Sequence, residues 1–316
     1  MRTRRENTVS DQEIHKKNVL TQKVRKNIFV AGMLLIAVAH FIVFWGVVNF
    51  NSILLAFQRL NTSTGKRYFT FENFKTIKIL FKLGEMKTAL CNTLLTSGFI
   101  TVFLLPWSFF LTYFLYKKIP LNSVWRTMLF IPTIIPVIAM AYIFRYMLYN
   151  SGPIGGLWKL FGARTPALLE NPHYAKWTVL FYIFWTNFGG QFILLSGAMS
   201  RVSKEVVESA RVDGAGMGAE MLRIVLPLCW PTVSMLILLN MAGLFTATGP
   251  LLFLNWGQAE TETISYWIFK KTFFPSAIGI QLNEPAALGL ICTVLLFPII
   301  LLVRWGLGKV YANVEF

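Results

Sequence analysis

Polar and small side chains recur at helical spacing inside two strongly apolar stretches of the chain. In the first stretch, four such residues lie three or four positions apart, and in the second an amide precedes a leucine by about one helical turn. They are Thr186, Asn187, Gly190 and Gln191, followed later by Asn240 and Leu244. Amide side chains donate and accept hydrogen bonds, which suits a hydroxylated solute. The same groups can instead bond neighbouring helices to one another.

A charged segment lies between these two stretches. Residues 201–225 include four acidic and four basic side chains, although apolar runs flank them on both sides. Apolar residues that start at Val202 fall on one helical face, and Glu208 and Arg211 fall on another. Gly214 then tolerates the left-handed backbone with which a helix often ends. The pattern predicts two short helices about a glycine elbow at the membrane surface, which either contact a partner or only anchor the flanking stretches.

Catalytic and metal-binding patterns are missing from the sequence. His15, His40 and His173 are scattered and share no metal-ligand spacing. No G-x-x-x-x-G-K phosphate loop occurs, and Ser196 lacks the G-x-S-x-G surround of a nucleophile elbow. The three cysteines lie in separate apolar runs, so we expect small buried side chains there. If energy drives this protein, another chain supplies it.

The elements that must position these residues are membrane spans. The chain is 55% hydrophobic and contains 28 Phe and 10 Trp, which is too apolar for one soluble domain. A helix needs about 20 mostly apolar residues to cross the hydrocarbon core. Six such runs occur, at 28–57, 89–116, 125–148, 177–199, 227–254 and 286–308. Prolines interrupt several of them, which is tolerable inside a helix bundle.

Basic residues set the expected orientation of the spans. The densest cluster of Lys and Arg lies in residues 1–27, immediately before the first span, so we expect this tail in the cytoplasm. An even number of spans then places the C-terminal residues and the charged segment on the same side. The net charge of +16 does not indicate nucleic acid binding, because the basic residues flank spans instead of forming one stripe.

The order of residues in the charged segment resembles a known signature. The run ESA at 208–210 is followed by Gly214 after three residues and by IVLP at 224–227 after nine more. This order resembles E-A-A-x3-G-x9-I-x-L-P, the signature of the membrane permeases of binding-protein-dependent ABC importers, with Ser209 where that family prefers alanine. Further runs are similar to the carbohydrate-uptake branch, the maltose-type permeases: NTL at 92–94, RTMLFIPTIIPVIAMAYIFRYML, FTATGPLLF and ISYWIFKKTF.

The resemblance implies a mechanical role for the charged segment. In such importers this segment is a coupling helix that seats in a cleft of a cytoplasmic ATPase, so that closure of the ATPase dimer moves the spans. Glu208 would be a charged contact to the ATPase, and Gly214 would set the elbow of the lever. The ATPase-coupling residues implied in this way are Val206, Val207, Glu208, Ser209, Ala210, Asp213, Gly214 and Met217.

The resemblance also implies a solute pathway through spans four and five. The corresponding places in maltose-type permeases line the sugar pocket, and Trp185 and Phe188 would suit the faces of sugar rings. The substrate-binding residues implied are Thr186, Asn187, Gly190, Gln191, Asn240 and Leu244. Bonding between helices stays open for Asn187 and Asn240 and is favoured for Gln191.

We therefore expect an all-α polytopic membrane protein with six transmembrane helices and a cytoplasmic coupling helix between spans four and five. Its parts would be a basic cytoplasmic tail (1–27), a first span with an external loop (28–88), a five-helix permease core (89–308) with coupling loop 201–225, and a cytoplasmic tail (309–316). It would import a carbohydrate across the plasma membrane by ATP-driven alternating access. Its partners would be a second, homologous permease, two ATPase subunits and an extracytoplasmic solute-binding protein. This chain would bind no cofactor, since ATP and Mg would bind the ATPase subunits.

Three other functions have distinct signatures. A permease for a non-sugar solute such as a polyamine predicts carboxylates in the middle of the spans, and none occurs there. A membrane-embedded lipid-modifying enzyme predicts a catalytic dyad or a metal cluster near an interface. An ion channel acting alone predicts conductance without any ATPase.

Overall fold

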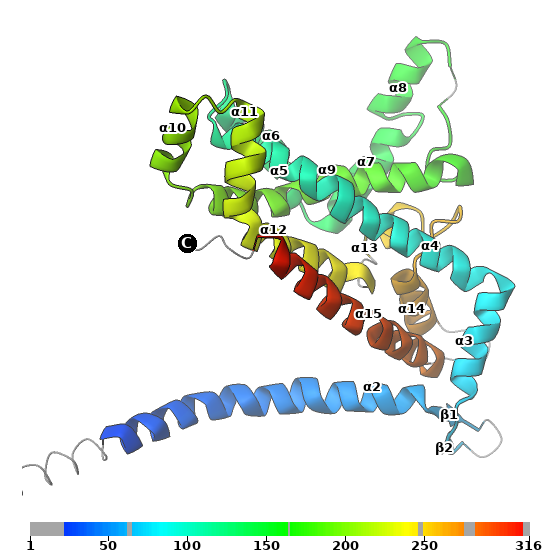
Figure 1. Ribbon diagram of the computed structural model, residues 1–316. Helices are drawn as coiled ribbons and strands as arrows, with labels where there is room; N and C mark the ends of the chain where they lie inside the picture. The colour runs from blue at the N-terminus through cyan, green and yellow to red at the C-terminus, as the bar shows by residue number, and fades with distance from the viewer. Residues whose placement is uncertain (1–21, 62–64, 164, 246–248, 275–281, 312–316) are drawn as a thin grey trace, which may run out of the picture. The chain divides into compact units, whose positions relative to one another are not determined.

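The computed structural model describes residues 22–61, 65–163, 165–245, 249–274 and 282–311 (Figure 1). It divides into two units, Met1–Phe69 and Thr70–Phe316, which we describe separately. The described residues are mainly helical, so the predicted all-α class is confirmed. Of the described helices, five are long and apolar enough to cross a membrane, and a bent pair of helices brings the number to six if the pair is one span.

The first unit is a long helix followed by a small hairpin. The helix runs from Gln22 to Ala56 and includes the π-helical η1 (Phe41–Val47) and α2 (Val48–Ala56). Strands β1 (Gln58–Leu60) and β2 (Arg67–Phe69) then pair antiparallel, with Gln58 opposite Phe69. Gly65 has φ +65°, and its amide donates to the carbonyl of Asn61 at 2.8 Å. This hairpin was not predicted from the sequence, because each strand is only three residues long.

The second unit contains the remaining elements. In chain order they are α3 (Glu72–Leu83), α4 (Glu85–Gly98), η2 (Phe99–Leu104), α5 (Leu105–Tyr116), α6 (Asn122–Ile134), α7 (Val137–Leu148), α8 (Pro153–Leu160), α9 (Pro172–Met199), α10 (Lys204–Val212), α11 (Met217–Ala219), η3 (Glu220–Val225), α12 (Leu226–Ala242), η4 (Gly243–Phe245), α13 (Gly249–Leu254), α14 (Ile264–Phe273) and α15 (Asn283–Val310). Helices α4, η2 and α5 form one continuous helix, Glu85–Tyr116, as predicted for span two.

The predicted third span is not one straight helix. It breaks between α6 and α7, which form an angle of 107° when the second half is taken as Val137–Leu160. Pro136 explains the break, since it disfavours the helical conformation at the preceding residue, and Ile135 is indeed extended with ψ 133°. Pro132, by contrast, stays inside α6.

The fifth span also differs from its predicted bounds. One helix runs from Met217 to Phe245, so the second short helix expected after Gly214 is the start of the span itself. The predicted end near residue 254 stays a prediction, because residues 246–248, which precede α13, lie outside the described residues. Within span five, the π-helical η3 lies just before Pro227. In span two, the π-helical η2 lies just before Pro106 in the same way. A wider turn relieves the clash between a proline ring and the carbonyl four residues earlier.

Helix α9 lies at the centre of the packing in this unit. It contacts α5, α6 and α12, and Figure 1 shows it running alongside the first two. A Cβ at Gly189 would lie 2.1 Å from Thr133 Oγ1 of α6, so only glycine permits this approach. One core cluster joins α5, α9, α10 and α12 through Leu105, Phe109, Tyr113, Leu195, Ala198, Met199, Val202, Val207, Val225, Cys229, Val233 and Leu236.

Candidate functional site

The charged segment folds as a helix followed by a left-handed glycine. Helix α10 ends at Val212, and Gly214 has φ +85°. Its amide donates to the Arg211 carbonyl at 3.0 Å, and the Ala215 amide donates to the Ala210 carbonyl at 2.9 Å. These two bonds satisfy carbonyls that the helix end would otherwise leave without partners. The turn predicted at Gly214 is therefore present.

The predicted coupling residues divide between an inner and an outer face. Val207 is 5% exposed and belongs to the core cluster, so it fastens α10 and is not part of its surface. Val206 and Met217 are 46% and 55% exposed, although both are apolar. Of the remaining predicted residues, Ala210 is half-buried, and Glu208, Ser209, Asp213 and Gly214 are exposed. The outer face thus combines exposed apolar area with a carboxylate.

Glu220 was not predicted as a functional residue. The sequence showed it only as one of the charges of the segment, but the structure buries it to 2% exposure beside Lys117 and Arg211. Lys117 lies far away in the sequence, so no local spacing indicated the contact. The only available signal was an acidic residue inside an apolar helical pattern.

The polar residues of span four lie on an open strip of α9. Thr186 Oγ1 donates to the Tyr182 carbonyl at 2.9 Å, and Asn187 Nδ2 donates to the Ile183 carbonyl at 3.0 Å. Asn187 and Gly190 are exposed, and a Cβ at Gly190 would meet no atom within 4 Å. These residues therefore share one accessible face.

Three other residues of this helix that were predicted to contact the solute are buried or half-buried. Gln191 is 7% exposed, and its Oε1 is buried without a hydrogen-bond partner among the described residues. Phe188 is 3% exposed and clusters with Leu115 and Phe192, so the structure does not offer its ring to a solute. Trp185 is half-buried beside the core that contains Phe144.

The two predicted substrate-binding residues of span five, Asn240 and Leu244, differ in chemistry. Asn240 is half-buried in α12, and its Nδ2 is buried without a hydrogen-bond partner in the described part of the chain. Since a buried donor left unpaired is unfavourable, a hydrogen-bond acceptor from outside the described residues would stabilise this amide. Leu244 is half-buried in η4 and contributes only apolar surface.

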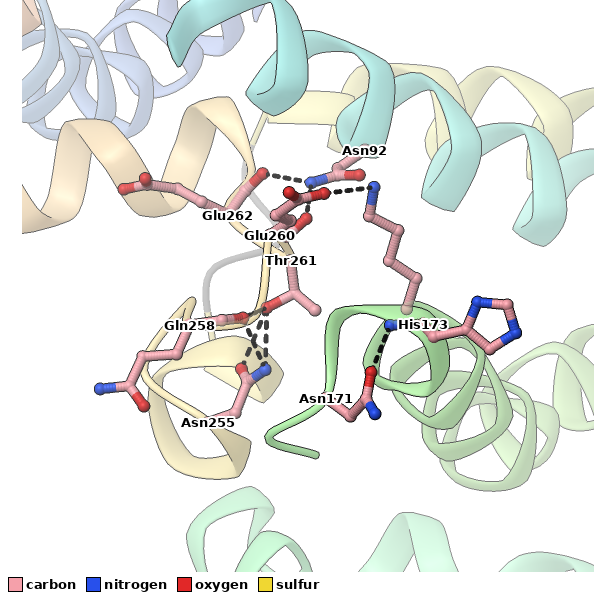
Figure 2. A network of polar contacts seen from close by, with 9 residues as sticks. Asn92, Asn171, His173, Asn255, Gln258, Glu260, Thr261 and Glu262 are labelled. Atoms are coloured by element: carbon pink, nitrogen blue, oxygen red, sulfur yellow. Dashed lines mark hydrogen bonds and ion pairs between the residues drawn. The ribbon is translucent and has the colours of Figure 1, made fainter. Parts of the chain in front are cut away.

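A polar network holds an irregular loop against the opposite end of α9 (Figure 2). Asn92 of α4 donates from Nδ2 to the carbonyls of Glu260 and Glu262 at 2.7 and 2.8 Å. Lys176, near the start of α9, forms an ion pair of 3.8 Å with Glu260. Asn255 and Thr261 bond to each other within the loop at 2.9 Å. Because α9 spans 28 residues, about 42 Å, this loop and α10 lie at opposite ends of the helix.

The backbone of this loop is strained. Trp256, Ala259 and Glu260 all have positive φ, between 53° and 57°, a region that residues other than glycine seldom adopt. Such conformations persist only where surrounding contacts hold them. Asn92 supplies two of these contacts, which gives the NTL run at 92–94 a structural role that its sequence did not reveal.

The chain matches one protein-family model and is similar to several transport permeases. The family model described as "Binding-protein-dependent transport system inner membrane component" matches residues 90–313. The multiple sugar-binding transport system permease protein MsmF of Streptococcus mutans is 24% identical over 212 residues, which are 66% of this chain and 73% of that protein. The sn-glycerol-3-phosphate transport system permease protein UgpA of Yersinia pseudotuberculosis is 28% identical over 129 residues, 40% of this chain and 42% of that protein.

The fold has solved counterparts. The chain resembles one in the structure of a bacterial alginate ABC transporter in complex with an alginate pentasaccharide-bound periplasmic protein. The TM-score is 0.79 at 20% identity, and the match covers 93% of this chain and 99% of that chain. A likeness at this identity shows a shared fold.

The first prediction concerns the loop. Replacing Asn92 with Ala should leave two carbonyls without their donor and lower the stability of the purified protein by about 1–3 kcal/mol, while proteolysis within 255–263 becomes faster. Thermal unfolding and limited proteolysis measure the two effects. Cys91→Ala is the matched control, since Cys91 is exposed, contrary to the burial expected for it. Unchanged stability and protection in Asn92→Ala would contradict the role of this side chain.

Proposed function

This chain belongs to the family of inner membrane components of binding-protein-dependent transport systems, and from this membership we propose that it is the permease subunit of an ABC importer that moves a carbohydrate into the cytoplasm. The observation that carries the proposal is the extent of the family match, residues 90–313, which includes the charged segment and both groups of mid-span polar residues. The several apolar helices agree with a multi-pass protein of the inner membrane.

The substrate class follows from the relatives and from the residues of the spans. MsmF is named for sugar transport, and the structural counterpart transports alginate, an acidic polysaccharide. Span four (Pro172–Met199) contains no Asp or Glu, and the only carboxylate of span five (Met217–Phe245) is Glu220, which lies near the start of that helix and away from its middle. This composition disfavours a cationic solute such as a polyamine, whereas amides such as Asn240 can bond the hydroxyl groups of a sugar.

The mechanism proposed is alternating access driven by partner subunits. The outer face of α10, with Val206 and Glu208, would seat in a cleft of an ATPase together with Met217 at the start of span five, and Gly214 would allow α10 and span five to meet at an angle. ATP and Mg would bind the two ATPase subunits, so this chain would carry out no hydrolysis itself. A second permease would complete the pathway, and an extracytoplasmic solute-binding protein would deliver the carbohydrate. Both termini and α10 would lie in the cytoplasm.

The experiment that tests this function measures uptake by the assembled complex. Affinity purification of the chain from its own membrane should recover ATPase subunits, identified by mass spectrometry. Liposomes that contain this complex and the solute-binding protein should take up a radiolabelled carbohydrate from a panel of maltose, maltotriose and alginate oligosaccharides only when ATP is present. Uptake of glycerol 3-phosphate alone would redirect the substrate class, and the absence of any ATPase would overturn the proposal.

A second test addresses the docking charge of α10. Glu208→Ala should leave the protein in the membrane, because the side chain is exposed and contributes little to folding, but it should weaken recovery of the ATPase or separate hydrolysis from uptake. Glu205→Ala, an exposed carboxylate on the same helix, is the matched control and should behave as the native protein does. Native recovery and native uptake for Glu208→Ala would remove this residue from the docking contact.

A third test addresses the pathway. Asn240→Leu should reduce uptake about two- to tenfold, the loss expected for one or two hydrogen bonds to a solute, while ATPase association persists. Asn187→Leu should have the smaller effect, because the Asn187 amide already bonds within α9. Thr178→Val of α9, whose hydroxyl donates to the Tyr174 carbonyl, is the control for helix bonding. Parallel loss of uptake and complex in Asn240→Leu would instead favour a bond between helices.

A further inference from the structure

The Glu220 carboxylate is buried where three elements meet. Glu220 begins η3 and is 2% exposed. Its Oε1 pairs with Nζ of Lys117, the residue that follows α5, and its Oε2 accepts from Nε of Arg211 in α10 at 3.0 Å. Each carboxylate oxygen therefore holds a different element against span five.

Neutral contacts reinforce the same junction. The Tyr113 hydroxyl of α5 donates to the Met217 carbonyl at 3.3 Å, so α5 is bonded to the first turn of span five. Val207 and Val225 belong with Tyr113 to one core cluster.

The hydrogen bond from Arg211 to Glu220 also raises the pKa of the Arg211 guanidinium, which stays charged at any physiological pH.

The backbone that connects α10 to span five is flexible, so by itself it transmits a movement poorly. It runs through Gly214 and Gly216, and a Cβ at either position would meet no atom within 4 Å. No side chain of the described residues therefore packs where these two glycines lack one, and glycine permits rotation at both positions. The Arg211–Glu220 ion pair crosses the elbow and joins its two arms directly.

The ionic contact is better suited to fixing geometry than to adding stability. A buried ion pair commonly stabilises a fold no more than apolar packing would, because both ions lose water. A carboxylate bonded by two cations from two elements, however, is satisfied only in one arrangement of those elements. Lys117 has a side chain that is 13% exposed, so it too would be unfavourable without this partner.

Resting on the proposed function, we propose that Glu220 is a positioning residue that makes α10, the end of α5 and the start of span five one rigid unit. A displacement that an ATPase imposes on α10 then moves spans two and five together. Without the carboxylate, the displacement is taken up by rotation at the Gly214 elbow.

The test measures the rigidity of this unit in the complete transporter. Spin labels are placed on cysteines introduced at Lys118, after α5, and at Val212, at the end of α10, with Cys91, Cys229 and Cys292 replaced. The complex with its ATPases is studied in liposomes without nucleotide and after trapping with ATP and vanadate. With Glu220 present, one narrow distance is expected in both states. With Glu220→Gln, we expect the distribution of distances between the two labels to broaden and its mean to differ between the two nucleotide states, while ATP hydrolysis continues.

Two control variants distinguish the positioning role of Glu220 from a role in folding. Glu205→Gln removes an exposed carboxylate of α10 and should keep the narrow distance. If Glu220→Gln does not assemble, the double variant Lys117→Gln/Glu220→Gln removes both buried charges and should assemble with a broadened distance. A narrow distance, unchanged between states, in the assembled variant would overturn this inference alone. A native chain that recruits no ATPase would overturn the proposed function and this inference with it.

Discussion

Lipid offers no hydrogen bonds to a polypeptide backbone, and this constraint determines where the chain can leave the helical conformation. At two places in the second unit where a helix ends or the chain is irregular, side chains from neighbouring elements bond the backbone. At the end of α5, the Leu115 carbonyl accepts from Asn122 at 2.8 Å and from Arg126 at 3.3 Å. In the loop after α13, Asn92 bonds two carbonyls in the same way. Polar side chains near the ends of spans thus complete the bonding that hydrocarbon cannot.

The same constraint distinguishes the polar residues inside the spans. Thr112 and Thr186 each donate to a carbonyl four residues earlier, so their hydroxyl hydrogens are satisfied within their own helix. Asn240 departs from this rule, because its buried Nδ2 has no hydrogen-bond partner within the described ranges. A hydroxyl that turns back on its own helix fits a structural role, whereas an unpaired amide is a group that a solute or partner can satisfy. On this criterion Asn240 is a stronger candidate than Thr186.

The sequence predicted the features that depend on local composition. Apolar runs located the spans because the length of a helix across the bilayer is fixed by hydrocarbon thickness, and Gly214 indicated its own turn. The break at Ile135 was not predicted, since Pro132 stays helical only a turn earlier and the surroundings decide which proline bends the chain. Burial of Val207 and Phe188 was also missed, because a polar or apolar pattern does not show which face meets a neighbouring helix. Glu220 was missed because its partner Lys117 follows a different span.

Helix α9 relates the separate sites to one another. Near its start, Lys176 pairs with Glu260 of the strained loop; its middle carries Asn187; and its last turns pack through Leu195 and Met199 into the core cluster that holds α10. The helix is continuous over 28 residues without an internal proline, so displacement of one end is not absorbed along its length. The chain from α6 to α8, by contrast, bends by 107° between Asn122–Ile134 and Val137–Leu160 and does not follow one axis. Helix α9 is therefore one continuous helix that contacts both the strained loop and the core cluster that holds α10.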